Sequence, residues 1–196
     1  MKKISLLVIF LSVLFFGIYY SNKVNLNFLH TTGEAIDSLN HVQVYFNGGV
    51  NHVEGRTIID GYNVGLKYQC VEFVKRYYLE FYKHKMPDSY GHAKSFFQRQ
   101  LKDGAINKQR NLLQFSNPSR NIPEVGDLLV LDGSVFNQYG HVAIISNVSG
   151  NEIEIIQQNP GPFSSSRASF NLMDIDGKYQ IESNRILGWL RKQELK

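Results

Sequence analysis

Hydrophobic and polar positions divide the chain into an apolar start, a polar stretch and a longer region of mixed pattern. Residues 4–20 form an unbroken, mostly apolar run behind Lys2 and Lys3. A positively charged start followed by such a run is typical of an export signal, and its length is near the lower limit for a membrane span. We expect residues 1–23 to be a signal anchor or an uncleaved export signal, residues 24–40 a spacer, and residues 41–196 one domain.

Within that domain, helical spacing predicts a helix that begins near residue 70 and ends before Pro87. Its apolar stripe is Val71, Val74, Tyr78 and Phe81, widened by Phe73 and Tyr77. Its charged positions, which predict a face in contact with solvent, are Glu72, Lys75, Arg76 and Glu80. A second helix is expected over residues 93–101, and a surface loop over residues 107–123, which are rich in Asn, Arg and Pro.

Short apolar runs bounded by turn residues predict strands over residues 42–46, 128–131, 141–146 and 152–157. The last three follow one another closely, which is typical of an antiparallel meander. Helices followed by strands indicate the α+β class.

The composition of the chain limits the partners, cofactors and metal ions that we expect. The 21 Lys and Arg residues and 17 Asp and Glu residues give a formal charge of +4, and the basic residues are scattered, so no nucleic-acid partner is indicated. A single cysteine excludes an internal disulfide, and the sequence has neither a CxxC nor an HExxH motif, so we expect no metal and no cofactor. We also expect a monomer.

The single cysteine, Cys70, lies where a loop turns into the predicted helix. Unpaired N–H groups at a helix N-terminus stabilise a thiolate, so this position favours a lowered pKa and a nucleophilic thiol. A lone cysteine is also commonly a small buried hydrophobic residue, and the rest of the chain must decide between the two.

His141 begins a predicted strand, and the geometry of the predicted hairpin leaves two candidates for the residue opposite it. If the turn is centred on Ser149, His141 lies opposite Gln157; if it is centred on Gly150, His141 lies opposite Asn159. Either amide could accept a hydrogen bond from the imidazole and orient it. A cysteine, a histidine and an amide that orients the histidine are the nucleophile, the general base and the orienting residue of a thiol hydrolase.

Several runs of the sequence together resemble the CHAP family, the cysteine, histidine-dependent amidohydrolases/peptidases. They are Val64–Phe73, Val125–Leu128, Gly140–Ile145, Gln158–Asn159 and Ile186–Leu190. The resemblance spans about residues 40–191 and is closest to the amidase domain of bacterial glutathionylspermidine synthetase/amidase. It implies a papain-like α+β fold in which N-terminal helices precede an antiparallel sheet and the nucleophile helix packs on that sheet.

The same resemblance implies that Cys70 is the nucleophile and His141 the general base of a catalytic domain. The third member in the amidase is a glutamate that aligns with Gln157, so this chain departs from that pattern, and Asn159 is the reserve candidate for orienting His141. Gln69 or the backbone N–H of Cys70 is expected to supply the oxyanion site, although Gln69 is equally compatible with a cap on the helix.

Three functions follow from these residues. The first is a cell-envelope hydrolase that cuts amide bonds of peptidoglycan peptides through a thioester acyl-enzyme, held to the membrane by the N-terminal helix or secreted. The second is a small-molecule amidase of glutathionylspermidine type. The third is a catalytically silent wall-binding protein, which the presence of both Cys70 and His141 disfavours.

Overall fold

The computed structural model describes residues 2–135 and 137–193. It contains the helices α1 (Lys2–Ser21) and α2 (Cys70–Glu80) and the 3₁₀ helix η1 (Ala93–Phe96). Its strands are β1 (Ala35–Leu39), β2 (Val42–Tyr45), β3 (Arg56–Ile59), β4 (Tyr62–Leu66), β5 (Ala105–Asn107), β6 (Leu112–Ser116), β7 (Leu128–Leu131), β8 (His141–Ser149), β9 (Glu152–Ile156), β10 (Arg167–Ile175), β11 (Lys178–Ile181) and β12 (Ile186–Arg191).

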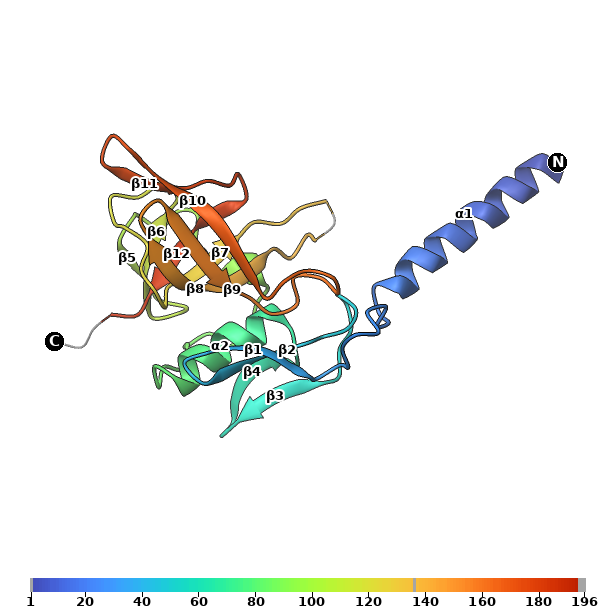
Figure 1. Ribbon diagram of the computed structural model, residues 1–196, viewed down its shortest axis with the longest axis horizontal. Helices are drawn as coiled ribbons and strands as arrows, with labels where there is room; N and C mark the ends of the chain where they lie inside the picture. The colour runs from blue at the N-terminus through green and yellow to red at the C-terminus, as the bar shows by residue number, and fades with distance from the viewer. Residues whose placement is uncertain (1, 136, 194–196) are drawn as a thin grey trace.

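The strands form one large sheet and two hairpins. The large sheet has the order β11-β10-β9-β8-β7-β12-β6-β5, while β1 pairs with β2 and β3 pairs with β4. All of these pairings are antiparallel. Helix α2 contacts β2, β4 and β8, so it lies between the hairpins and the large sheet (Figure 1). The α+β class with the Cys70 helix on an antiparallel sheet is therefore confirmed.

Several local expectations were wrong. After α1, four strands precede α2, so the helices of the domain do not come first, and its second helix is only the short η1. The segment expected to be a surface loop, residues 107–123, contains β6, which joins the large sheet beside β12. The region expected to be a spacer contains β1, which pairs with β2.

The N-terminal segment, residues 1–23, was expected to be a signal anchor. Helix α1 occupies most of it and extends away from the sheets (Figure 1). Of the residues that the structure describes, no helix combines the length and the apolar character that a membrane crossing requires.

The apolar stripe predicted for α2 is buried in its middle, but Phe81 lies beyond the end of the helix and is exposed. Phe73, Val74, Tyr77 and Tyr78 are fully buried and share one core with side chains of β7, β8 and β9. The opposite face is not in contact with solvent, however, because Glu72, Lys75 and Arg76 are also buried. Only Glu80 of the four charged positions is exposed. The prediction of a solvated face was therefore wrong.

A glycine allows α2 to approach β4 closely. Gly65 has φ +147°, and a Cβ at this position would lie 3.0 Å from the Cα of Glu72. Both the backbone conformation and the spacing favour glycine. The contact fixes the first turn of α2, and with it Cys70, against the β3–β4 hairpin.

The other face of the large sheet forms a second core around Trp189. The sheet almost closes on itself, because Ser119, after β6, exchanges two backbone hydrogen bonds with Tyr179 of β11, with N···O distances of 3.1 and 2.7 Å. This arrangement gives a rigid support for β8, which carries His141 at its first position.

Candidate active site

A cavity of about 520 Å³ lies at the N-terminus of α2. Five parts of the chain line it: residues 50–56, the junction of β4 and α2, residues 89–93, residues 137–141 and Asn159. Cys70 and His141 both face this cavity, so the structure brings together the two residues singled out from the sequence. Gln157 lies behind His141 and does not line the cavity.

Cys70 is the first residue of α2 and is partly buried. The backbone N–H groups of Val142, Val71 and Cys70 itself favour the thiolate form of its side chain. Val142 directly follows His141, which places the thiol beside the imidazole-bearing residue. Burial raises the pKa of the Cys70 thiol, and the three N–H groups offset only part of this effect. The expected lowering of the thiol pKa was therefore wrong for the resting protein.

His141 is held by Gln157. The distance from His141 Nε2 to Gln157 Oε1 is 3.0 Å, and the Nε2 of Gln157 donates to the carbonyl oxygen of Ser165 at 3.2 Å. The second bond fixes the amide so that its oxygen faces the imidazole. Because that oxygen can only accept, the proton of neutral His141 lies on Nε2 and Nδ1 is left free to accept one.

The hairpin register explains how this contact forms. Ile144 pairs with Ile156, and a bulge between Ile145 and Asn147 shifts the pairing nearer the turn. Continued towards His141, this register matches the turn centred on Gly150 and places Asn159 opposite the histidine. Gln157 reaches His141 diagonally instead, which a long side chain can do across the ~7 Å between diagonal neighbours.

Asn159 is used elsewhere. Its Nδ2 donates to the carbonyl oxygen of Val50 at 2.9 Å and to Oε1 of Gln69 at 2.8 Å. Gln69 in turn donates both of its amide hydrogens, to the carbonyl oxygens of Val50 at 3.2 Å and His52 at 2.9 Å. Its side chain does not cap α2 and has no N–H left for an oxyanion. The structure therefore contradicts both functions considered for the Gln69 side chain, the helix cap and the oxyanion donor. Gln69 and Asn159 together hold the loop at residues 50–52 instead.

A buried network that the sequence did not reveal joins the nucleophile helix to the segment that follows β9 and contains Gln157. Gln158 is fully buried and donates through Nε2 to Oε2 of Glu72 at 2.9 Å and to the carbonyl oxygen of Gln69 at 3.1 Å. Its Oε1 accepts from the backbone N–H of Tyr45 at 2.7 Å. Glu72 also forms a buried ion pair with Arg76 at 2.7 Å. The positions of Cys70 and Gln157 are therefore coupled through Gln158.

Two buried cations hold the segment at residues 88–90 as one wall of the cavity. Lys75 donates to the carbonyl oxygens of Asn63 and Ser89, the latter at 2.8 Å. Arg110 donates to the carbonyl oxygens of Asp88 at 2.5 Å and Tyr90 at 3.2 Å. Burial, together with repulsion from Arg110 and Arg56, lowers the pKa of Lys75 to about 8. This wall could not be predicted from the sequence, because both cations lie in segments that were expected to face solvent.

Burial also sets the protonation state of His141. It lowers the pKa of His141 to about 4, with a smaller contribution from Arg185, while the hydrogen bond that His141 donates to Gln157 acts in the opposite direction. The resting site therefore holds a neutral imidazole beside a neutral thiol at pH 7.

The free energy of unfolding is expected to fall by about 3 kcal/mol as the pH decreases from about 6.5 to 4. Below pH 6.5 the histidine of the unfolded chain takes up a proton that the buried His141 does not, so acid favours unfolding, and the loss is complete below the folded pKa. Urea denaturation across this pH range measures it. A His141→Gln protein should lose this step; an unchanged pH dependence in that variant would contradict the assignment.

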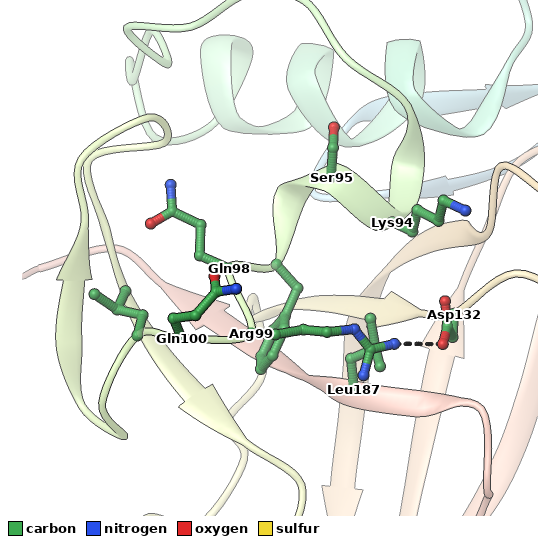
Figure 2. Close-up of a pocket in the computed structure, with 9 residues that line it drawn as sticks. Lys94, Ser95, Gln98, Arg99, Gln100, Asp132 and Leu187 are labelled. Carbon is green, nitrogen blue, oxygen red and sulfur yellow. Dashed lines mark hydrogen bonds and ion pairs between the residues drawn. The ribbon is translucent and has the colours of Figure 1, made fainter.

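A second cavity of about 570 Å³ lies on the other side of η1 (Figure 2). Figure 2 shows Lys94, Ser95 and Gln98 at its edges and Arg99 pointing to Asp132, with an N···O distance of 2.5 Å. It is shallow and contains neither a cysteine nor a histidine, so it is not the reaction site. Among the described residues, no three His, Cys, Asp or Glu side chains come together to hold a metal ion.

Comparison with known proteins supports a hydrolase site. The model of the CHAP domain family matches residues 60–159, which include Cys70, His141 and Gln157. Trypanothione synthetase of Crithidia fasciculata is 32% identical over 120 residues, covering 61% of this chain and 18% of that protein. The bifunctional glutathionylspermidine synthetase/amidase of Escherichia coli (strain K12) is 33% identical over 150 residues, covering 71% of this chain and 24% of that protein.

The chain thus spans at most about a quarter of the length of these curated relatives. Among solved structures, the crystal structure of Ly7917 matches with a TM-score of 0.41 and 14% identity, covering 64% of this chain and 53% of that one. The structure of Ly7917 with the hydrolyzing product of MDP matches with a TM-score of 0.39 and 18% identity, covering 64% of this chain and 54% of that one.

Proposed function

Because the chain belongs to the CHAP domain family, a family of amidases and peptidases, we propose that it hydrolyses peptide amide bonds with Cys70 as the nucleophile. The observation that carries this proposal is the shared cavity of Cys70 and His141, with Nε2 of His141 bound to Gln157. That arrangement leaves Nδ1 as the only nitrogen able to accept the thiol proton.

The reaction proceeds in two stages. Nδ1 of His141 takes the proton from Cys70 as the sulfur attacks the carbonyl carbon, and the same proton then passes to the leaving amine as the C–N bond breaks. The acyl group remains on Cys70 as a thioester. A water molecule then attacks the thioester while His141 accepts its proton, and the carboxylic acid leaves as the thiol is restored.

Backbone donors support the charges that develop during this cycle. The N–H groups of Val142, Val71 and Cys70 favour the thiolate when it forms. Of the two oxyanion candidates considered from the sequence, only the N–H of Cys70 remains, because the side chain of Gln69 is already bound. Fixed donors aimed at a developing charge usually give the largest contribution to catalysis.

We propose peptides of peptidoglycan as the substrate and a site of action outside the cytoplasm. The proposal for location rests on the charge and hydropathy pattern of residues 1–20, which is typical of an export signal. The proposal for substrate combines that location with a peptide-sized cavity that is open to solvent. Fractionation of cells that produce the full chain would test the location directly.

A second candidate is an amidase that acts on a conjugate of glutathione and a polyamine. The observation that favours it is the similarity to the glutathionylspermidine synthetase/amidase of Escherichia coli, which covers 71% of this chain. The lining of the cavity disfavours it, because none of its described residues is an Asp or Glu that would pair with a polycationic leaving group.

The full chain is expected to release new amino and carboxyl termini from purified peptidoglycan, identified by mass spectrometry. Termini that form with the wild-type protein and not with a Cys70→Ala protein would establish the reaction and identify the bond. Glutathionylspermidine serves as the comparison substrate. Hydrolysis of that conjugate alone would favour the second candidate, and no hydrolysis of either would leave the wall-binding alternative.

A further inference from the structure

Arg56 differs from the other residues of the catalytic cavity in its charge. It is the only Lys, Arg, Asp or Glu among the described residues that line the cavity. It lies at the start of β3, and its register partner in β4 is Leu66, which also lines the cavity. The carbonyl oxygen of Leu66 accepts from the backbone N–H of Gln69, directly before Cys70. Arg56 therefore lies at the edge of the cavity that leads to the nucleophile.

The guanidinium group is held in place from behind. Nη1 of Arg56 donates to Oδ1 of Asn63 at 2.8 Å. The amide of Asn63 cannot turn freely, because its Nδ2 donates to the carbonyl oxygen of Ser89 at 2.8 Å. Ser89 is fixed in turn by the buried Lys75. A surface arginine ordinarily loses side-chain entropy when it binds a ligand, and this chain of contacts reduces that cost.

The remaining donors of Arg56 have no acidic partner. Among the described residues, the ion pairs of the protein do not include Arg56. Its guanidinium lies 5.8 Å from the centre of the Tyr90 ring, another residue of the cavity wall. One N–H is used by Asn63, so four of the five donors of an arginine are left for a ligand.

We propose that Arg56 binds a free carboxylate of the substrate next to the bond that Cys70 cleaves. This inference rests on the proposed function, because it assigns a substrate group to the same cavity. A guanidinium matches a carboxylate through two parallel hydrogen bonds, and such charge-assisted bonds are stronger than neutral ones. The site therefore selects peptides with an unmodified carboxylate and disfavours both the carboxamide forms of the same peptides and polycationic conjugates.

Binding to the full-length Cys70→Ala protein tests this subsite without turnover. The probes are a short peptidoglycan stem peptide with a free carboxylate beside the target amide and the same peptide with a carboxamide in its place. Calorimetry is expected to show the carboxylate form binding about 10- to 100-fold more tightly. Adding Arg56→Gln should remove this preference, while Arg56→Lys should keep part of it, because lysine retains the charge without the planar fork.

Arg99→Gln in the same background is the matched control, because it removes one arginine from the second cavity and should leave the preference unchanged (Figure 2). Equal affinity for the two peptides, binding of neither, or a preference that survives Arg56→Gln would overturn the inference. Hydrolysis by the wild-type protein is measured separately, so a carboxylate preference without hydrolysis would count against the proposed function and not against the subsite.

Discussion

Replacing Cys70 with alanine is expected to lower the rate of amide hydrolysis by about 10⁴-fold or more, because it removes the thiol that forms the covalent intermediate and Cys70 is the only cysteine among the described residues of the cavity. The fold should be retained, since the cysteine is small and only partly buried. Initial rates and a thermal melt measure the two effects. Mass spectrometry of the wild-type protein during turnover should detect a thioester on Cys70. A Cys70→Ala protein that keeps a tenth of the rate would exclude this mechanism.

The pH dependence of the hydrolysis rate separates the contribution of His141 as general base from that of Cys70 as nucleophile. In the wild-type protein, His141 has a pKa of about 4, so its Nδ1 should accept the thiol proton down to about that pH. In a His141→Ala protein the thiol must ionise alone, and burial raises its pKa. The rate of that variant is therefore expected to be about 10²- to 10⁴-fold lower at pH 7 and to rise with pH. An acidic limb near pH 6.5 in the wild-type protein would contradict the low pKa of His141.

The sequence predicts the parts of this site that depend on local pattern and motif order. Cys70 at a helix start and His141 at a strand start both lie on the cavity. Gln157 contacts the histidine, but the register that placed it directly opposite His141 was wrong, because the observed pairing matches a turn centred on Gly150. The contact itself depends on a bulge and a diagonal reach. Neither is visible in the alternation of apolar and polar residues, so the pattern identifies the partner without explaining its geometry.

The parts that sequence reasoning missed depend on long-range contacts. A helical stripe separates apolar from charged positions, but it cannot show that β2 and β4 cover the charged side of α2. Glu72 and Lys75 are buried for this reason. Arg56 was missed although it is exposed, because an exposed arginine in a short strand has no distinguishing pattern. Only the cavity reveals its position.

Replacing Glu72 with alanine is expected to reduce the free energy of unfolding by about 3–5 kcal/mol, a large part of the stability of a small domain. Arg76 is only 6% exposed and would be left as a buried charge, since its other acceptor, the carbonyl oxygen of Gln43, carries no charge. Gln158 would also lose its bond to the carboxylate. Urea denaturation with an unchanged m-value measures the loss.

Two further variants show whether the loss of stability in Glu72→Ala comes from the unpaired charge of Arg76, from helix propensity or from the lost side-chain volume. Glu80→Ala, at the exposed end of the same helix, is expected to change stability by at most about 0.5 kcal/mol. The double variant Glu72→Met with Arg76→Leu should cost less than Glu72→Ala, because it removes both charges and refills the space. If the double variant is as unstable as Glu72→Ala, the unpaired charge is not the cause. Because Gln158 also holds the carbonyl of Gln69 before Cys70, Glu72→Ala should lower the hydrolysis rate of the protein that remains folded.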